Sequence, residues 1–222
     1  MDSLIIKRIF EDRYTYLLFS LLVLIIVTPF VEYTTVFNVS LLSIFFLSVV
    51  IAILWTLHLR PLLFRAYLAT ACVVFVLDLL TSTQVDEPST RMTLLSAGVY
   101  SVFVFAVMFA LTIEIFRESK VTIKTIQGGI SVYLLIGIFW SLICLFLSIL
   151  APGSFSGNLD EYSDYLYFSF VTMTTLGYGD VVPLTKIAKN AAVFNAVSSQ
   201  LFLAIYIARL VGMHMANPAQ KK

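Results

Sequence analysis

Long apolar stretches are the feature that most limits what this chain can fold into. A helix needs about 20 mostly apolar residues to cross a bilayer. Six stretches approach or exceed that length: 14–31, 37–57, 62–80, 92–116, 126–150 and 186–211. Only helices and closed barrels satisfy every backbone polar group in lipid, and these stretches are continuous rather than alternating with period two. We therefore predict an all-α membrane protein with six transmembrane helices.

Composition supports a membrane protein and argues against a nucleic-acid partner. Of the 222 residues, 60% are hydrophobic and 12% are charged, compared with about 45–50% and about 25% in an average soluble domain. The formal net charge is +1, so there is no basic excess that would attract nucleic acid. Cys72 and Cys144 both lie within apolar stretches, where we expect buried structural thiols.

The segment between the fifth and sixth stretches, 151–184, has a different character. It opens with Pro152 and Gly153 and closes near Pro183, residue types that interrupt regular helices. Within it, 161–173 is rich in aromatic residues and, as a helix, is only about half as long as a bilayer is thick. Acidic residues surround its start, where they favour a helix N-terminus. We predict a re-entrant half-helix that enters the membrane and returns to the same side.

The distribution of Lys and Arg predicts the orientation. An even number of spans puts both termini on one side, and positive residues are enriched on the cytoplasmic side of membrane proteins. Placing the termini in the cytoplasm puts eleven of the 14 basic residues there: Lys7, Arg8, Arg13, Arg60, Arg65, Arg117, Lys120, Lys124, Arg209, Lys221 and Lys222. We expect a multi-pass protein of the cell membrane with both termini cytoplasmic.

The loop after the half-helix, Thr174 to Asp180, reads Thr-Thr-Leu-Gly-Tyr-Gly-Asp. To replace the water shell of a cation, successive carbonyl oxygens must point toward one narrow axis, and this requires a backbone that alternates between left- and right-handed regions. Gly177 and Gly179 adopt positive φ at little steric cost. We predict that this loop binds permeating cations at Thr175, Leu176, Gly177, Tyr178 and Gly179.

The side chains of the loop predict selection by neutral groups. Leu176 and Tyr178 are expected to point away from the axis and hold its diameter, while Thr175 adds a hydroxyl oxygen at the inner end. No anionic side chain lies within this ring, so neutral dipoles that suit a monovalent ion would select the cation. A Gly-Tyr-Gly turn alone is common in loops; its position after a half-helix and before Asp180 gives it weight.

At these residues the chain resembles the tetrameric potassium channel family, whose selectivity filter reads Thr-Val-Gly-Tyr-Gly-Asp. Thr175 to Asp180 match it except at Leu176, which keeps an aliphatic side chain. The resemblance covers the fifth helix through Val211 and the first four helices only by number, and the chain looks like a small prokaryotic six-helix member. It implies a homotetramer in membrane lipid, because there is one filter segment per chain. It also implies potassium selectivity, no cofactor besides the permeant K+, and K+ held at Thr175, Leu176, Gly177 and Tyr178.

This resemblance divides the chain into five parts. They are an interfacial N-terminal segment (1–13), a four-helix voltage-sensor-like domain (14–116), an interfacial linker (117–125), a pore domain (126–212) and a short cytoplasmic tail (213–222). The fourth helix of voltage-gated relatives carries a cation at every third position, whereas 92–116 contains neither Lys nor Arg. We therefore expect at most weak voltage dependence.

Several residues are expected to support the filter. In the resembling family, two adjacent tryptophans donate hydrogen bonds to the filter, and their positions are Tyr167 and Phe168 here. Tyr167 keeps a donor, so we predict a hydrogen bond from its hydroxyl to Asp180, while the Tyr178 hydroxyl would rely on Thr172 or water. The alternative is that Asp180 is solvated at the outer mouth and raises the local cation concentration. The full set is Tyr167, Phe168, Thr172, Thr174 and Asp180.

The last helix is expected to hold a hinge and an inner gate. Alignment from the filter places Ser199 where many relatives have a hinge glycine, and a serine lets a helix bend by hydrogen-bonding a preceding carbonyl. Four residues at helical spacing would face the pore, or alternatively pack against lipid or protein: Gln200, Leu203, Ile207 and Val211. The apolar inner end around Ile207 and Val211 would gate by dewetting.

An enzyme is the main alternative from another class, and the residues argue against it. His58 and His214 are the only histidines, and neither a Gly-x-Ser-x-Gly nor a His-Glu-x-x-His motif is present. Among channels, a weakly selective cation pore and a non-conducting subunit are the alternatives to a potassium-selective pore.

Overall fold

The computed structural model describes residues 13–32, 90–157 and 159–216, and its regular elements are all helices. In chain order these are α2 (Arg13–Glu32), α5 (Thr90–Arg117), α6 (Ile123–Leu150), α7 (Tyr162–Met173) and α8 (Lys186–Ala216). The prediction of an all-α protein is confirmed for this part of the chain. The expected spans 37–57 and 62–80 lie outside the described residues, as do the first twelve residues and the last six.

Three of the described helices are long and apolar enough to cross a membrane. They are Thr93–Arg117, Ile123–Leu150 and Lys186–Ala216, and a shorter apolar helix runs over Tyr14–Phe30. These helices coincide with four of the expected stretches. A total of six spans stays a prediction.

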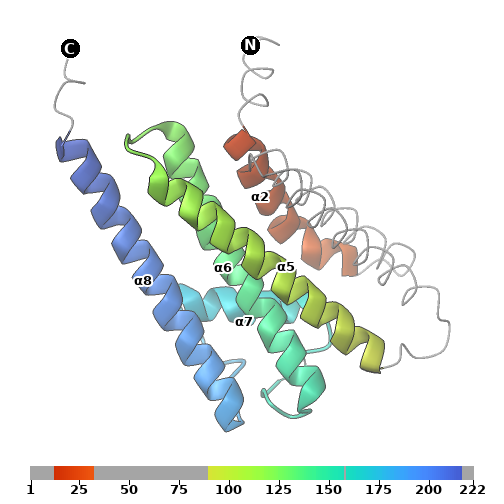
Figure 1. Cartoon of the computed structure of the whole chain (residues 1–222). Coiled ribbons are helices and arrows are strands. Elements are labelled where there is room, and N and C mark those ends of the chain that lie inside the picture. The colour runs from red at the N-terminus through yellow and green to blue at the C-terminus, as the bar shows by residue number, and fades with distance from the viewer. Residues whose placement is uncertain (1–12, 33–89, 158, 217–222) are drawn as a thin grey trace.

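Helix α6 is the central element of the described part, because it contacts each of the other four helices. Figure 1 shows α5 and α6 as an antiparallel hairpin, with α8 along the other side of α6. The short helix α7 lies across these long helices, between α6 and α8. The two helices that flank α7 in sequence, α6 and α8, therefore also flank it in space.

The hairpin between α5 and α6 is tighter than the expected linker 117–125. Thr122 is the N-cap of α6, and its Oγ1 accepts a hydrogen bond of 3.2 Å from the N–H of Thr125. The Thr125 hydroxyl lies 2.9 Å from the Thr122 hydroxyl and 3.1 Å from the carbonyl oxygen of Lys120. Because this capping starts the helix at Ile123, the last part of the expected linker is the first turn of α6.

The apolar core is formed mainly by α2, α5 and α6. Its fully buried side chains include Leu17, Leu21, Val107, Leu111, Ile115, Val132, Leu135 and Ile138. Helix α8 contributes Tyr206 to this core and leaves many large apolar side chains exposed, among them Phe194, Val197, Leu201, Ile205, Ile207 and Val211. The chain by itself thus covers α6 well and α8 poorly.

The C-terminal half of α8 is fastened to the α5–α6 hairpin by two polar side chains. The Tyr206 hydroxyl donates to the carbonyl oxygen of Thr125. The Arg209 guanidinium donates to the carbonyl oxygens of Ile115 and Phe116, each at 2.8 Å, and lies 4.9 Å from the centre of the Phe116 ring. Since the last carbonyls of a helix lack partners within it, Arg209 caps the C-terminal end of α5.

Gly129 permits this close approach, and Gly129→Ala should lower the thermal stability of the protein in lipid or detergent. A Cβ at this position would lie 2.0 Å from Cε1 of the Tyr206 ring, which is buried and hydrogen-bonded. Overpacking of this kind costs roughly 1–3 kcal/mol. Gly98→Ala is the matched control, because its Cβ would meet its nearest neighbour at an ordinary 3.6 Å. Equal unfolding midpoints for the two variants would contradict the described packing.

Candidate functional site

The start of α7 is fixed by acidic capping and by tyrosine hydroxyls. Asp164 Oδ2 accepts hydrogen bonds of 3.1 Å from the N–H groups of Asp160 and Glu161, and Glu161 is the N-cap. The hydroxyl of Tyr165 donates to Ser148 Oγ on α6 at 2.7 Å. The expected acidic N-terminus of the half-helix is confirmed, and α7 begins one residue later than the expected range.

Left-handed residues alternate along the loop that follows α7. The φ angles of Thr175, Gly177 and Gly179 are 61°, 54° and 82°, whereas neither Leu176 nor Tyr178 has a positive φ. The positive φ predicted for both glycines is confirmed. Thr175 is a further such position, and residue type gave no signal for it because a β-branched residue rarely adopts positive φ.

The end of α7 holds the beginning of this loop through backbone hydrogen bonds. The N–H groups of Leu176 and Gly177 both donate to the carbonyl oxygen of Val171, at 3.0 and 3.3 Å. The N–H of Thr175 donates to the carbonyl oxygen of Thr172 at 3.1 Å. Among the described residues, no backbone hydrogen bond ends on a carbonyl oxygen of residues 175–179. The first N–H groups of the loop, through Gly177, therefore donate to α7, while its carbonyl oxygens remain available to other partners.

The loop is uncovered in the single chain. Every residue from Thr174 to Asp180 is exposed, including the side chains of Leu176 (54%) and Tyr178 (68%). An aliphatic and an aromatic side chain that are expected to pack behind a filter thus lack a complete cover within one chain. If the loop is an ion-binding site, it is incomplete without neighbours.

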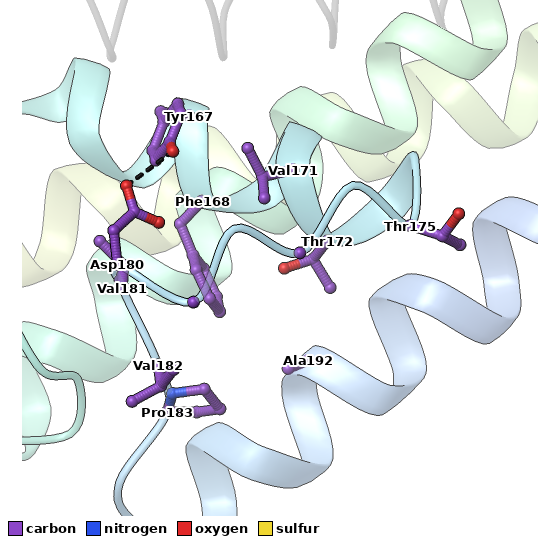
Figure 2. A pocket seen from close by; sticks show the side chains of 12 residues that line it. Tyr167, Phe168, Val171, Thr172, Thr175, Asp180, Val181, Val182, Pro183 and Ala192 are labelled. Carbon is purple, nitrogen blue, oxygen red and sulfur yellow. Dashed lines mark hydrogen bonds between the residues drawn. The ribbon is translucent and has the colours of Figure 1, made fainter.

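Tyr167 on α7 contacts Asp180 at the far end of the loop. Its hydroxyl donates to Asp180 Oδ2 over 2.6 Å, the dashed line in Figure 2. This hydrogen bond raises the pKa of Tyr167 to about 12 and lowers the pKa of Asp180, so the Asp180 carboxylate stays ionised to lower pH than usual. The predicted hydrogen bond is confirmed, and its role in supporting a filter stays a prediction.

The other expected support residues occupy different places. Phe168 is buried and packs edge-on against Phe155, with ring centroids 5.3 Å apart. Thr172 is half-buried, and the hydrogen bonds of the described residues include none between it and Tyr178. The Thr174 hydroxyl donates to the carbonyl oxygen of Phe170 at 2.7 Å. Thr174 is therefore the C-cap of α7.

A cavity of about 300 Å³ lies between α7, the loop and α8. Figure 2 shows Tyr167, Phe168 and Thr172 on one side of it and Pro183 and Ala192 on the other. The backbone of Gly177 and Gly179 also borders it. The loop is therefore packed less tightly toward α8 than toward α7.

The expected hinge and pore-facing residues separate into two groups on α8. Ser199 is fully buried, so its side chain lies in protein packing, and its hydroxyl donates to the carbonyl oxygen of Asn195 at 2.7 Å, the type of bond expected at a serine hinge. Gln200, Ile207 and Val211 are exposed and Leu203 is half-buried. The Gln200 amide donates to the carbonyl oxygen of Met173, the last residue of α7 before the loop, at 2.8 Å.

Sequence reasoning missed two buried polar residues, Ser169 on α7 and Asn195 on α8. Asn195 is 1% exposed and Ser169 is fully buried. The Asn195 amide donates to the carbonyl oxygen of Ser169 at 3.1 Å. A signal for Asn195 was present, because an amide side chain inside an apolar span is unusual.

Comparison with known proteins adds independent information about the segment that holds this site. Residues 130–215 match the family model described as Ion channel. Potassium channel K2 of Plasmodium falciparum is 38% identical over 71 residues, covering 30% of this chain and 5% of that protein. Two pore potassium channel a of Oryza sativa is 29% identical over 105 residues, covering 44% of this chain and 26% of that protein.

A further relative is Two-pore potassium channel 5 of Arabidopsis thaliana, which is 40% identical over 70 residues, or 28% of this chain and 17% of the relative. This chain spans about a quarter or less of the length of these relatives. No solved structure matches the chain significantly. The matched segment, the relatives and the apolar helices support a potassium channel family of membrane proteins.

Proposed function

We propose that the chain forms a homotetrameric channel that conducts K+ passively, with residues 175–179 as its selectivity filter. The observation that carries this proposal is the alternation of left-handed residues at Thr175, Gly177 and Gly179 in a loop whose carbonyl oxygens accept no backbone hydrogen bonds among the described residues. Such a backbone directs successive carbonyls to one side, where they replace the hydration shell of a cation.

The incompleteness of the loop in one chain supports assembly around an axis, for which we propose a tetramer. One chain supplies one row of carbonyl oxygens, and a ring around an axis needs several rows. The exposed apolar face of α8 supports assembly, because it lies next to the loop and has few partners within the chain. In this assembly α7 is the pore helix, α6 the outer helix and α8 the inner helix of a pore domain at 126–212.

The proposed orientation places the α5–α6 hairpin and the end of α8 in the cytoplasm. The α5–α6 hairpin and the C-terminal end of α8 lie at the same end of the described helices (Figure 1). This part of the chain includes Arg117, Lys120, Lys124 and Arg209, and cytoplasmic loops are enriched in Lys and Arg. Helix α5 contains no Lys or Arg between Met92 and Phe116. Moving one charge through 100 mV supplies about 2.3 kcal/mol, so the channel should respond weakly to voltage.

Potassium selectivity is tested by reversal potentials of the purified full chain in planar bilayers, with opposed K+ and Na+ gradients. The parent should reverse near the potassium equilibrium potential. Gly177→Ala should abolish selective current, because a Cβ at φ 54° strains the loop although it meets no atom within 4 Å. Gly153→Ala is the matched control outside the loop, with φ 81° and equally open space, and should conduct as the parent does. A parent reversal potential near zero would leave a weakly selective cation channel, and no current a non-conducting subunit.

The support of the loop by Tyr167 is tested by Tyr167→Phe, which removes the hydroxyl at nearly constant shape. We expect faster decay of current or lower selectivity, and a similar, non-additive effect of Asp180→Asn, because both delete the same hydrogen bond. Tyr133→Phe on α6 is the control for loss of a tyrosine hydroxyl. Parent-like current in Tyr167→Phe, with a salt-dependent loss of conductance in Asp180→Asn alone, would favour a solvated Asp180.

External pH gives a second measure of the same hydrogen bond. The Tyr167 hydroxyl is the main cause of the lowered pKa of Asp180, so the bond is intact above that pKa and is lost as pH falls through it. Without the hydroxyl, the pKa of Asp180 should rise toward its usual range. The acid-induced change in current should then begin at higher pH in Tyr167→Phe than in the parent.

The position of the inner gate is tested by Ile207→Ser. Ile207 is 50% exposed near the C-terminal end of α8, and a polar side chain there should wet an apolar constriction and raise the open probability in single-channel records. Ile205→Ser is the matched control, since it has the same side chain, 53% exposure and a different face of α8. Unchanged activity in an assembled Ile207→Ser channel would place the gate elsewhere, for instance at the filter.

A further inference from the structure

Three helices meet at one buried set of polar groups, which we name the polar joint: the carbonyl of Gly137 on α6, Ser169 on α7, and Asn195 and Ser199 on α8. Ser169, Asn195 and Ser199 are each at most 1% exposed. The polar joint is thus the place where the pore helix of the proposed channel is attached to both the outer and the inner helix.

Hydrogen bonds run through the polar joint from one helix to the next. Ser169 Oγ donates to the carbonyl oxygen of Gly137 at 2.7 Å. The Asn195 amide nitrogen donates to the carbonyl oxygen of Ser169 at 3.1 Å and to Ser169 Oγ at 3.3 Å. Ser199 Oγ lies 3.2 Å from Asn195 Oδ1 as well as 2.7 Å from the Asn195 carbonyl oxygen. Both ends of the Asn195 amide are therefore paired, which fixes its orientation.

Close packing holds α7 against α6 next to the polar joint. A Cβ at Gly137 would lie 2.6 Å from the Phe170 ring and 2.8 Å from Met173 Sδ, so α6 leaves no free space there. Helix α7 therefore packs against α6 through Phe170 and Met173, and it is hydrogen-bonded to α8 through Asn195. A change at Asn195 releases α7 on the side toward α8, next to the cavity of about 300 Å³.

The position of α7 determines the position of the loop. Val171, two residues after Ser169, accepts the N–H groups of Leu176 and Gly177. Phe170 and Thr172 accept those of Thr174 and Thr175. Any shift of α7 at Ser169 is passed through these bonds to the left-handed residues of the loop.

From this geometry we infer that Asn195 is a positioning residue for ion selectivity, which sets the diameter of the filter by fixing α7 between α6 and α8. Asn195 itself touches no permeating ion. The inference rests on the proposed function, because it concerns how the same loop discriminates K+ from Na+.

The inference also connects the expected hinge to the filter. Ser199 donates to Asn195, and the next residue, Gln200, donates to Met173 at the end of α7. Asn195 bonds to Ser169 and Gln200 bonds to Met173, four residues later on α7. A bend of α8 at Ser199 would move Gln200 relative to Asn195 and so alter these two hydrogen bonds to the last turn of α7. Bending of the inner helix and the shape of the filter are thus linked by side chains of α8.

The test is the permeability ratio of K+ to Na+ in single-channel records of the full chain, which does not depend on how many channels assemble. Asn195→Leu keeps a side chain of similar size and removes the amide. We expect the ratio to fall by about tenfold, equivalent to about 1.4 kcal/mol of lost discrimination. Asn195→Leu combined with Ser169→Ala should be no worse than Asn195→Leu alone, because both changes act on the same joint.

Ser198→Ala is the matched control. Ser198 Oγ accepts a 3.0 Å hydrogen bond from the Trp140 indole, so this change removes a polar contact between α6 and α8 that does not include α7. The parent ratio should persist in it. A parent-like ratio in Asn195→Leu would overturn the inference while leaving the proposed function intact, whereas an unselective parent would remove the proposed function itself.

Ser169→Ala keeps the test decisive if Asn195→Leu does not assemble. It removes the hydroxyl that joins Asn195 to Gly137 and leaves the backbone acceptor of Asn195 in place. Its ratio should fall by about threefold, corresponding to roughly half of the discrimination above. A parent-like ratio in Ser169→Ala would overturn the inference by the same reasoning, even if that variant showed a lower unfolding midpoint.

Discussion

An irregular backbone within a membrane is stable only when its polar groups find partners inside the protein or in water that the protein encloses. The first part of the loop, residues 174–177, meets this requirement for its N–H groups by lying against the C-terminal end of α7, whose carbonyl oxygens lack partners within the helix. The short length of α7 follows from this arrangement. A helix that ended at a membrane surface would offer its last carbonyls to bulk water rather than to the loop.

The same requirement makes the carbonyl oxygens of the loop stronger evidence for assembly than the exposed apolar side chains of α8. Lipid tails are as apolar as leucine, so an uncovered apolar face on a membrane helix can simply face lipid. The exposed face of α8 would be stable in that setting. Backbone carbonyls that accept no hydrogen bond cannot face lipid. Those of residues 175–179 accept no backbone hydrogen bond from the described residues, and in the proposed channel they would line an aqueous axis.

At the far end of the described bundle, two side chains of α8 bind backbone carbonyls of the α5–α6 hairpin. Arg209 binds those of Ile115 and Phe116 at the end of α5 and of Glu118 just beyond it, and Tyr206 binds that of Thr125 in the first turn of α6. Because α5 turns into α6 within a few residues, these bonds connect the end of α8 to the α5–α6 hairpin of the same chain. A displacement of α5 along its axis would therefore act directly on the segment of α8 that carries Ile207 and Val211.

Much of this protein was determined by local sequence. Apolar length alone predicted the described long helices, and Pro, Gly and acidic residues marked α7 and its start, because these signals depend on a few neighbouring residues. The positive φ of Gly177 and Gly179 and the pairing of Tyr167 with Asp180 also followed from residue type and spacing. Tertiary structure alone decided the positive φ of Thr175, the burial of Ser199 and the role of Asn195 in joining α8 to α7. The burial of Ser199 and the bond from Asn195 depend on how helices distant in sequence approach one another, and the type of a single residue does not say which partner it will meet.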